Sequence, residues 1–191
     1  MSDSSLVEWI GAAAGLACVW LVARANIWNW PVSILNTTLY FVVFLRASLY
    51  ADASLQVVFT ALGLYGWWSW RFGGALGGEL AIRRATRVEA MVAAFASLAG
   101  TALSALVLAG ATDSPVPIWD SSVLVLSLVA TWAQARKILE SWWVWIAVDV
   151  ISVPLYVSRE LYPTALLYTL FLALCVVGLR RWQVLLREQT S

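Results

Sequence analysis

The run from Met91 to Ala111 contains no charged side chain. It is long enough to cross the hydrocarbon core of a bilayer, for which a helix needs about 20 apolar residues. Similar runs follow one another along the 191 residues, and only 12% of the chain is charged. A soluble domain averages about 25% charged residues, so lipid is the expected solvent. The sequence predicts an all-α polytopic membrane protein.

Charge clusters and Pro or Gly breaks divide the chain into seven expected transmembrane helices. They are placed at residues 6–24, 30–46, 51–70, 88–111, 119–135, 142–158 and 163–182. The N-terminus lacks the positive region and cleavage site of a signal peptide, so the first apolar run is kept as a span. The expected domains are 6–70 and 119–183, two three-helix bundles, with a linker and connecting helix at 71–118 and a cytoplasmic tail at 184–191.

The basic residues fall unevenly between the two ends of these spans. Ten lie at one end, namely Arg24, Arg71, Arg83, Arg84, Arg87, Arg136, Lys137, Arg180, Arg181 and Arg187, and only Arg46 and Arg159 lie at the other. Cytoplasmic loops of membrane proteins are enriched in Lys and Arg. The pattern predicts a C-terminus in the cytoplasm and an N-terminus outside.

The chain also resembles itself when it is shifted so that Leu49 and Tyr50 match Leu161 and Tyr162. The same shift matches Trp20, Ala23, Arg24, Trp30, Ala53, Phe59, Gly66 and Trp70 with Trp132, Ala135, Arg136, Trp142, Ala165, Phe171, Gly178 and Trp182. This shift moves the sequence by four expected spans. Because four is an even number, the two halves would have the same orientation through the membrane. A parallel repeat of three helices around one connecting helix, 3+1+3, is a transporter architecture with its site near the midplane.

Composition removes several classes of chemistry. The chain has no histidine, and its two cysteines, Cys18 and Cys175, lie far apart in apolar runs. This predicts no metal site, no cofactor and no disulfide framework, and it gives little support to a membrane-embedded enzyme. A net charge of +1 predicts no nucleic-acid partner.

Asp149 lies near the middle of the sixth expected span. A carboxylate there costs about 2.5–3.5 kcal/mol on insertion scales, so it should face the bundle or a wet cavity. It could tie helices together through neighbouring hydroxyls or indoles, or it could face a ligand. Trp142, Trp145, Ser152 and Tyr156 share its helix face, at steps of three and four residues.

Comparable polar faces occur on four other spans, and each residue alone could serve as an interhelical tie. Their convergence favours a binding site for a flat and polar ligand that could be cationic, because aromatic faces attract cations and amides orient polar groups. The predicted substrate-binding residues are Asn36, Tyr40, Gln56, Thr60, Trp67, Thr131, Gln134, Trp142, Trp145, Asp149, Ser152, Tyr156 and Tyr168.

The stretch LGLYGWWSW divides between two expected roles. Trp67 continues the polar face of the third span and is expected to approach the ligand. Trp68 and Trp70 precede Arg71 and, with Trp182, are expected to be interfacial anchors. Gly66, repeated as Gly178, is expected to permit close helix packing.

These residues resemble the PnuC family of bacterial vitamin transporters over nearly the whole chain. The likeness is densest at YGWWSW, WDS, ARK and DVIS. It implies a SWEET-like pair of three-helix bundles in the bacterial inner membrane and facilitated uptake of nicotinamide riboside for NAD biosynthesis. A cytoplasmic kinase would trap the substrate without binding the transporter, and a homo-oligomer is possible.

The family also includes proteins similar to thiamine and riboflavin transporters, so thiamine and then riboflavin are alternative substrates. A vitamin-binding subunit of an ATP-driven importer is a further alternative, since a separate partner could supply the nucleotide motif that this chain lacks. Ser141 stands where many nicotinamide riboside members have asparagine, while Asn29 holds the matching place in the first half. This departure puts the substrate in doubt, though not transport.

Overall fold

The computed structural model describes residues 3–46, 48–111 and 116–190 and contains seven α-helices within them. The helices are α1 (Asp3–Ala23), α2 (Asn29–Arg46), α3 (Tyr50–Phe72), α4 (Arg87–Ala111), α5 (Pro117–Ala135), α6 (Ser141–Ser158) and α7 (Tyr162–Thr190), with a 3₁₀ turn, η1 (Ala75–Gly77), after α3. All seven starts lie within three residues of prediction. The largest difference is at α7, which continues through the expected start of the tail to Thr190.

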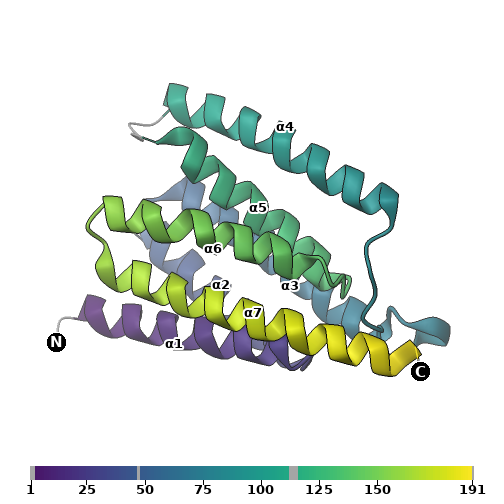
Figure 1. Cartoon of the computed structure of the whole chain (residues 1–191). Helices are drawn as coiled ribbons and strands as arrows, with labels where there is room; N and C mark the ends of the chain where they lie inside the picture. The colour runs from purple at the N-terminus through teal and green to yellow at the C-terminus, as the bar shows by residue number, and fades with distance from the viewer. Residues whose placement is uncertain (1–2, 47, 112–115, 191) are drawn as a thin grey trace.

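Six helices form a ring in the spatial order α1, α2, α3, α5, α6 and α7, and α7 packs on α1 to close it. The remaining helix, α4, packs on α5 outside the ring (Figure 1). The first bundle is therefore α1–α3, the second is α5–α7, and α4 connects them. This arrangement confirms the predicted 3+1+3 fold. The expected domain boundaries stay predictions, and residues 47, 112–115 and 191 within them lie outside the described residues.

Helix length and composition fit a membrane. The shortest helices, α2 and α6, have 18 residues and so extend about 27 Å at 1.5 Å per residue. In the described part of the chain, α4, α5, α6 and α7 are both long and apolar enough to cross a bilayer, and α1 is apolar from Gly11 to Ala23.

The backbone repeats with the same offset as the sequence. Ala25 and Lys137, which occupy matched positions of the repeat, both have positive φ angles, of 52° and 48°. Ser48 and Glu160, the next such pair, have φ angles of 61° and 59°. Residues other than glycine rarely adopt this left-handed conformation, so its recurrence at matched turns is strong evidence for the repeat.

A cluster of four tryptophans joins the halves at the end where α1, α3 and α5 finish. Trp30 contacts Trp70 edge to face at a ring-centroid distance of 5.5 Å, and their repeat partners Trp142 and Trp182 do the same at 5.5 Å. Trp70 and Trp182 meet across the pseudo-twofold axis at 6.0 Å. All four side chains are at least 98% buried. We call this set the tryptophan cluster.

Hydrogen bonds cross between the halves at the same place. The indole Nε1–H of Trp70 donates to the Gln134 carbonyl, and that of Trp182 donates to the Val22 carbonyl, each at 3.0 Å. Gln134 and Val22 are themselves matched positions of the repeat. The prediction that Trp70 and Trp182 anchor the protein at the membrane interface is therefore wrong. Each indole is buried because its polar atom is satisfied by a backbone carbonyl of the opposite half.

The two matched glycines make room for this cluster. A Cβ atom added at Gly66 would lie 2.6 Å from Cζ3 of Trp30, and one added at Gly178 would lie 2.6 Å from Cζ3 of Trp142. Ordinary contact begins at 3.4 Å. The predicted role in close packing is confirmed, since only a residue without a side chain lets the ring lie against the helix.

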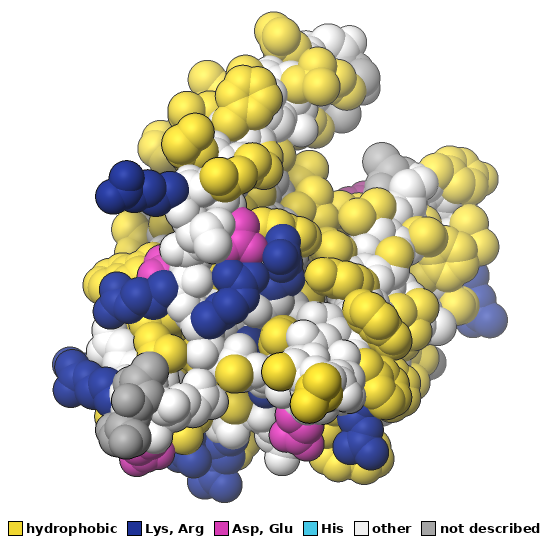
Figure 2. Space-filling model, turned by 90° about the vertical axis from the view of Figure 1, so that its right-hand side faces the viewer, with side chains coloured by type: hydrophobic (Ala, Val, Ile, Leu, Met, Phe, Trp, Pro, Cys, Tyr) yellow, Lys and Arg dark blue, Asp and Glu magenta, His cyan; other side chains and the backbone are white. Residues whose placement is uncertain are grey.

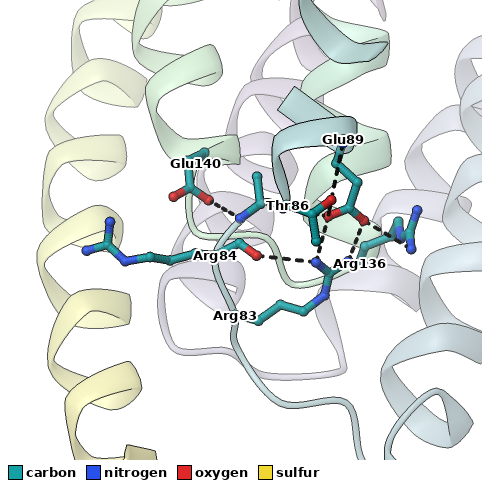
Figure 3. Close-up of polar contacts among 7 residues, drawn as sticks. Arg83, Arg84, Thr86, Glu89, Arg136 and Glu140 are labelled. Atoms are coloured by element: carbon teal, nitrogen blue, oxygen red, sulfur yellow. Dashed lines mark hydrogen bonds and ion pairs between the residues drawn. The ribbon is translucent and has the colours of Figure 1, made fainter. Parts of the chain in front are cut away.

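The connection from α3 to α4 is tied to the turn between α5 and α6 (Figure 3). Arg83 forms two hydrogen bonds with the Glu89 carboxylate, of 2.7 and 2.8 Å, and Arg136 approaches the same carboxylate at 3.1 Å. Glu140 accepts a hydrogen bond from the Ala85 amide. The Lys137 amine donates to the Leu80 carbonyl, and burial lowers the pKa of this amine. Many of the basic residues gather at this end (Figure 2).

Candidate functional site

A cavity of about 250 Å³ lies inside the ring of six helices. Each helix of the ring contributes side chains to its wall, and α4 does not. Ligand sites in helical proteins commonly lie between the helices of a bundle, with an apolar lining and a few polar groups. The position matches the predicted site between two three-helix repeats.

Seven of the thirteen predicted binding residues line the cavity. They are Asn36, Thr131, Gln134, Trp142, Trp145, Asp149 and Tyr168. They come from α2, α5, α6 and α7, so the structure brings together residues from both halves. Their roles toward a ligand stay predictions.

The other six lie outside the cavity wall: Tyr40, Gln56, Thr60, Trp67, Ser152 and Tyr156. Thr60 is held in a 2.8 Å hydrogen bond to Thr37, and Tyr156 packs its ring 5.0 Å from that of Tyr168. Trp67 is 43% exposed on the outer surface. On α3 the cavity wall includes only Phe59, and the binding roles predicted for Gln56, Thr60 and Trp67 stay predictions.

Several lining residues were not predicted, including Ser33, Asn29, Trp30 and Phe59. The repeat contained the missing signal for two of them. Trp30 and Phe59 match Trp142 and Phe171, and all four line the cavity. Ser33 has no comparable signal, since a single serine on an apolar helix is common as a tie to its own backbone.

The cavity wall is more polar on the side of the second half. Thr131 and Gln134 on α5 occupy the repeat positions of Val19 and Val22 on α1. Tyr168 on α7 corresponds to Gln56 on α3, which lies outside the wall. The fold is thus repeated, but the polarity of the lining side chains differs between the two halves. Because of this difference, an asymmetric ligand would bind in one orientation.

The polar groups of the second half are partly fixed by one another. The Trp145 indole donates to Oε1 of Gln134 at 2.8 Å, which leaves the amide Nε2 of Gln134 to donate to a ligand. Asp149 is 97% buried, and its Oδ2 lies 3.4 Å from the Cys175 sulfur. Across the described residues, the ion pairs involve Glu89 and Asp120 and not Asp149.

Nothing in the described ranges assembles three or more His, Cys, Asp or Glu side chains into a potential metal site. Aromatic rings, amides, hydroxyls and one carboxylate are groups that bind an organic molecule. A central cavity between two parallel three-helix repeats defines the class of a multi-pass membrane transporter.

Comparison with known proteins specifies the family. Residues 5–184 match the family model described as nicotinamide mononucleotide transporter. The chain is 30% identical to the nicotinamide riboside transporter PnuC of Escherichia coli strain K12, over 99% of this chain and 90% of that protein. The chain belongs to the PnuC family of transporters, whose matched members are not enzymes.

Two further relatives bear on fold and substrate. The crystal structure of the vitamin B3 transporter PnuC matches with a TM-score of 0.74 at 25% identity, over 97% of this chain and 83% of that chain. The riboflavin/roseoflavin transporter RibM of Streptomyces davaonensis is 34% identical, over 92% of this chain and 83% of that protein. Two relatives with similar sequence identity to this chain are thus named as transporters of different vitamins.

Proposed function

We propose that the protein imports nicotinamide riboside by facilitated diffusion, through a site in the central cavity. The observation that carries this proposal is the buried Asp149 carboxylate in a wall of aromatic rings, with no cationic partner among the described ion pairs. An uncompensated charge in such a place is costly. A cationic aromatic ligand would offset that cost and would also interact with the faces of Trp142, Trp145 and Tyr168.

Nicotinamide riboside combines a pyridinium cation with ribose hydroxyls and a carboxamide. The hydroxyls suit Asn36, Thr131 and the Nε2 donor of Gln134, which line the same cavity. The cavity volume of about 250 Å³ lies just below the 300–1,000 Å³ typical of drug-sized ligands. A two-ring nucleoside fits this size better than a three-ring flavin.

Riboflavin is the second candidate because the RibM relative is 34% identical. It is neutral and would leave Asp149 without a counter-charge. The position of Ser141 also bears on this choice, since its side chain is fully buried next to Trp142 but does not line the cavity. The replacement of asparagine by Ser141 therefore does not by itself decide between the vitamins. Thiamine, which is cationic and aromatic, is the third candidate.

For transport, we propose that the two bundles rock about the cavity. The tryptophan cluster would close the basic end in the described conformation and separate when the cavity opens to that side. We propose the inner membrane as the location, with the N-terminus outside and the basic end in the cytoplasm. A cytoplasmic kinase would then phosphorylate the vitamin and trap it inside the cell. Net uptake would follow although the transporter itself uses no energy source.

Uptake by proteoliposomes tests the substrate. The purified chain is reconstituted without ATP, and entry of labelled nicotinamide riboside is measured with unlabelled riboflavin or thiamine as competitor. We expect saturable entry that excess riboflavin does not suppress. Entry that requires ATP and a partner would favour an importer subunit, and labelled riboflavin entering in place of nicotinamide riboside would overturn the choice of substrate.

Asp149→Asn tests the observation on which the proposal depends. Loss of a charge-assisted interaction of about 1.5–3 kcal/mol should weaken binding of nicotinamide riboside by roughly 10- to 150-fold. Asp52→Asn is the matched control, since Asp52 is exposed in the first turn of α3. Tryptophan fluorescence titration of both variants measures the dissociation constants. Wild-type affinity in Asp149→Asn would make the carboxylate a purely structural group.

A further inference from the structure

A second hollow lies on the outside of the ring, between α3, α4 and α5. It has a volume of about 270 Å³ and is lined by apolar side chains only. We call it the α4 groove, and its residues are Val58, Leu62, Val92, Ala93, Ala96, Leu128, Val129 and Trp132. Figure 2 shows α4 standing away from the rest of the molecule, with the surface hollowed beside it. The α4 groove is separate from the central cavity, with which it shares no residue.

The end of the α4 groove nearest the basic residues is charged. The Arg136 guanidinium lies over the Trp132 ring at 5.2 Å, one helical turn beyond the groove. Glu89, one turn before Ala93, contacts both Arg136 and Arg83. These two guanidinium groups and one carboxylate leave a net charge of +1, and Figure 3 shows Arg83 and Arg136 on either side of Glu89, with the Arg84 side chain pointing away from Arg136.

We propose that the α4 groove binds one anionic phospholipid, with an acyl chain between α3, α4 and α5 and the phosphate at Arg136. The apolar lining excludes a polar ligand, and the cationic end selects a negative head group. Arg136 is suited to this role because its side chain is 37% exposed and contacts Glu89 through Nη2. The remaining N–H groups of its planar fork can donate to phosphate oxygens.

The α4 groove, with a volume of about 270 Å³ and an apolar lining, accommodates part of a fatty acyl chain. Each buried methylene contributes about 0.8 kcal/mol relative to water, but lipid tails already surround the protein in a bilayer. Selectivity among lipids must therefore come from the charged end, and the apolar part fixes where the lipid lies.

The opposite half of the molecule provides an internal comparison. Trp20 and Arg24 on α1 match Trp132 and Arg136, and Arg24 likewise lies over its tryptophan, at 4.2 Å. However, α4 has no repeat partner, so α1 lacks the third wall and the Glu89 cluster. The proposal thus assigns one specific lipid site per chain, on the α5 side. It does not depend on which vitamin is transported.

Native mass spectrometry of the full chain, supplied with phosphatidylglycerol or phosphatidylcholine of the same acyl length, tests this site. We expect one phosphatidylglycerol to be retained in preference to phosphatidylcholine. Arg136→Gln should reduce that preference about fivefold, and Ala96→Phe, which fills the α4 groove, should reduce retention by roughly tenfold. The matched controls are Arg46→Gln at the other end and Ala94→Phe on the opposite face of α4, and both should behave as wild type.

Photolabelling keeps the proposal testable if a variant fails to fold. Wild-type protein is irradiated with phosphatidylglycerol that has a diazirine in its acyl chain, and the labelled peptides are sequenced. Label at residues 91–97 and 128–132 supports the proposal. Equal retention of both lipids by the wild type, or label spread evenly over all helices, overturns it. If Ala96→Phe separates oligomers without changing lipid retention, a second copy of the chain occupies the α4 groove and the lipid is excluded.

Discussion

Gly178→Ala isolates the contact between α7 and the cavity wall. The added methyl carbon would lie 2.5 Å from Cζ2 of Trp142 and closer still to Cη2, where ordinary contact begins at 3.4 Å, so the ring must retreat by about 1 Å. The ring is 99% buried and is held edge to face against Trp182. Overpacking of this kind costs about 1–3 kcal/mol, which corresponds to a fall in Tm of roughly 2–12 °C for a chain of this size.

The same movement should affect transport, because Trp142 also lines the central cavity. A ring pushed away from α7 has the cavity as its open side, so KM for uptake should rise. Thermal melting in detergent and uptake by proteoliposomes are the two assays. Gly110→Ala is the control, since its added methyl carbon would meet nothing within 4 Å and alanine favours a helix. A Tm within about 1 °C of wild type in Gly178→Ala would refute the view that the cluster is rigid.

Two other substitutions test the repeat. Trp182→Phe and Trp70→Phe each remove one indole hydrogen bond, to the Val22 or the Gln134 carbonyl, and that carbonyl keeps its backbone donor at Ala25 or Lys137. Each substitution should therefore lower the free energy of unfolding by about 0.5–1.5 kcal/mol, and by similar amounts. Melting curves of the two variants measure the loss of stability, and Trp68→Phe is the control because Trp68 is 59% exposed. A large effect in only one of the two variants would contradict the structural equivalence of Trp70 and Trp182. Glu160→Gly replaces an exposed residue at φ 59° and should raise stability by about 0.5–1 kcal/mol, since relief of left-handed strain exceeds the entropy that glycine loses. Arg159→Gly, at a neighbouring position with φ −98°, should instead be destabilising, because it relieves no left-handed strain and also breaks the ion pair with Asp120. A gain there would show that loop flexibility and not strain is responsible.

Helix positions and the 3+1+3 order followed from the sequence because membrane helices must satisfy their backbone internally and therefore read as long apolar runs. The start of α6, for example, is predicted at residue 142 and lies at Ser141. The overrun of α7 was missed because Arg180, Arg181 and Trp182 have the composition of a membrane boundary. In the structure, Trp182 is buried against Val22, and the helix continues beyond it.

The site was only half predictable for a related reason. On α6, a stripe from Trp142 to Asp149 correctly indicated the inward face, because an acid in a span must turn away from lipid. On α3, Gln56, Thr60 and Trp67 gave the same kind of stripe, but Thr60 is satisfied by Thr37 within the first bundle. Helical spacing shows which side chains share a face, and it does not show whether that face meets a cavity or a neighbouring helix.

The crossed indole hydrogen bonds also constrain how the chain matures during synthesis. When the first three helices leave the ribosome, the Trp70 indole lacks its Gln134 acceptor. The Val22 carbonyl, which accepts from the Ala25 amide at 2.8 Å, gains its second donor only when Trp182 follows 160 residues later. The first bundle therefore emerges with its inner end unfinished, and the last turns of α7 complete both halves together. A chain truncated before Trp182 should be left with an open seam, which quality-control proteases would recognise.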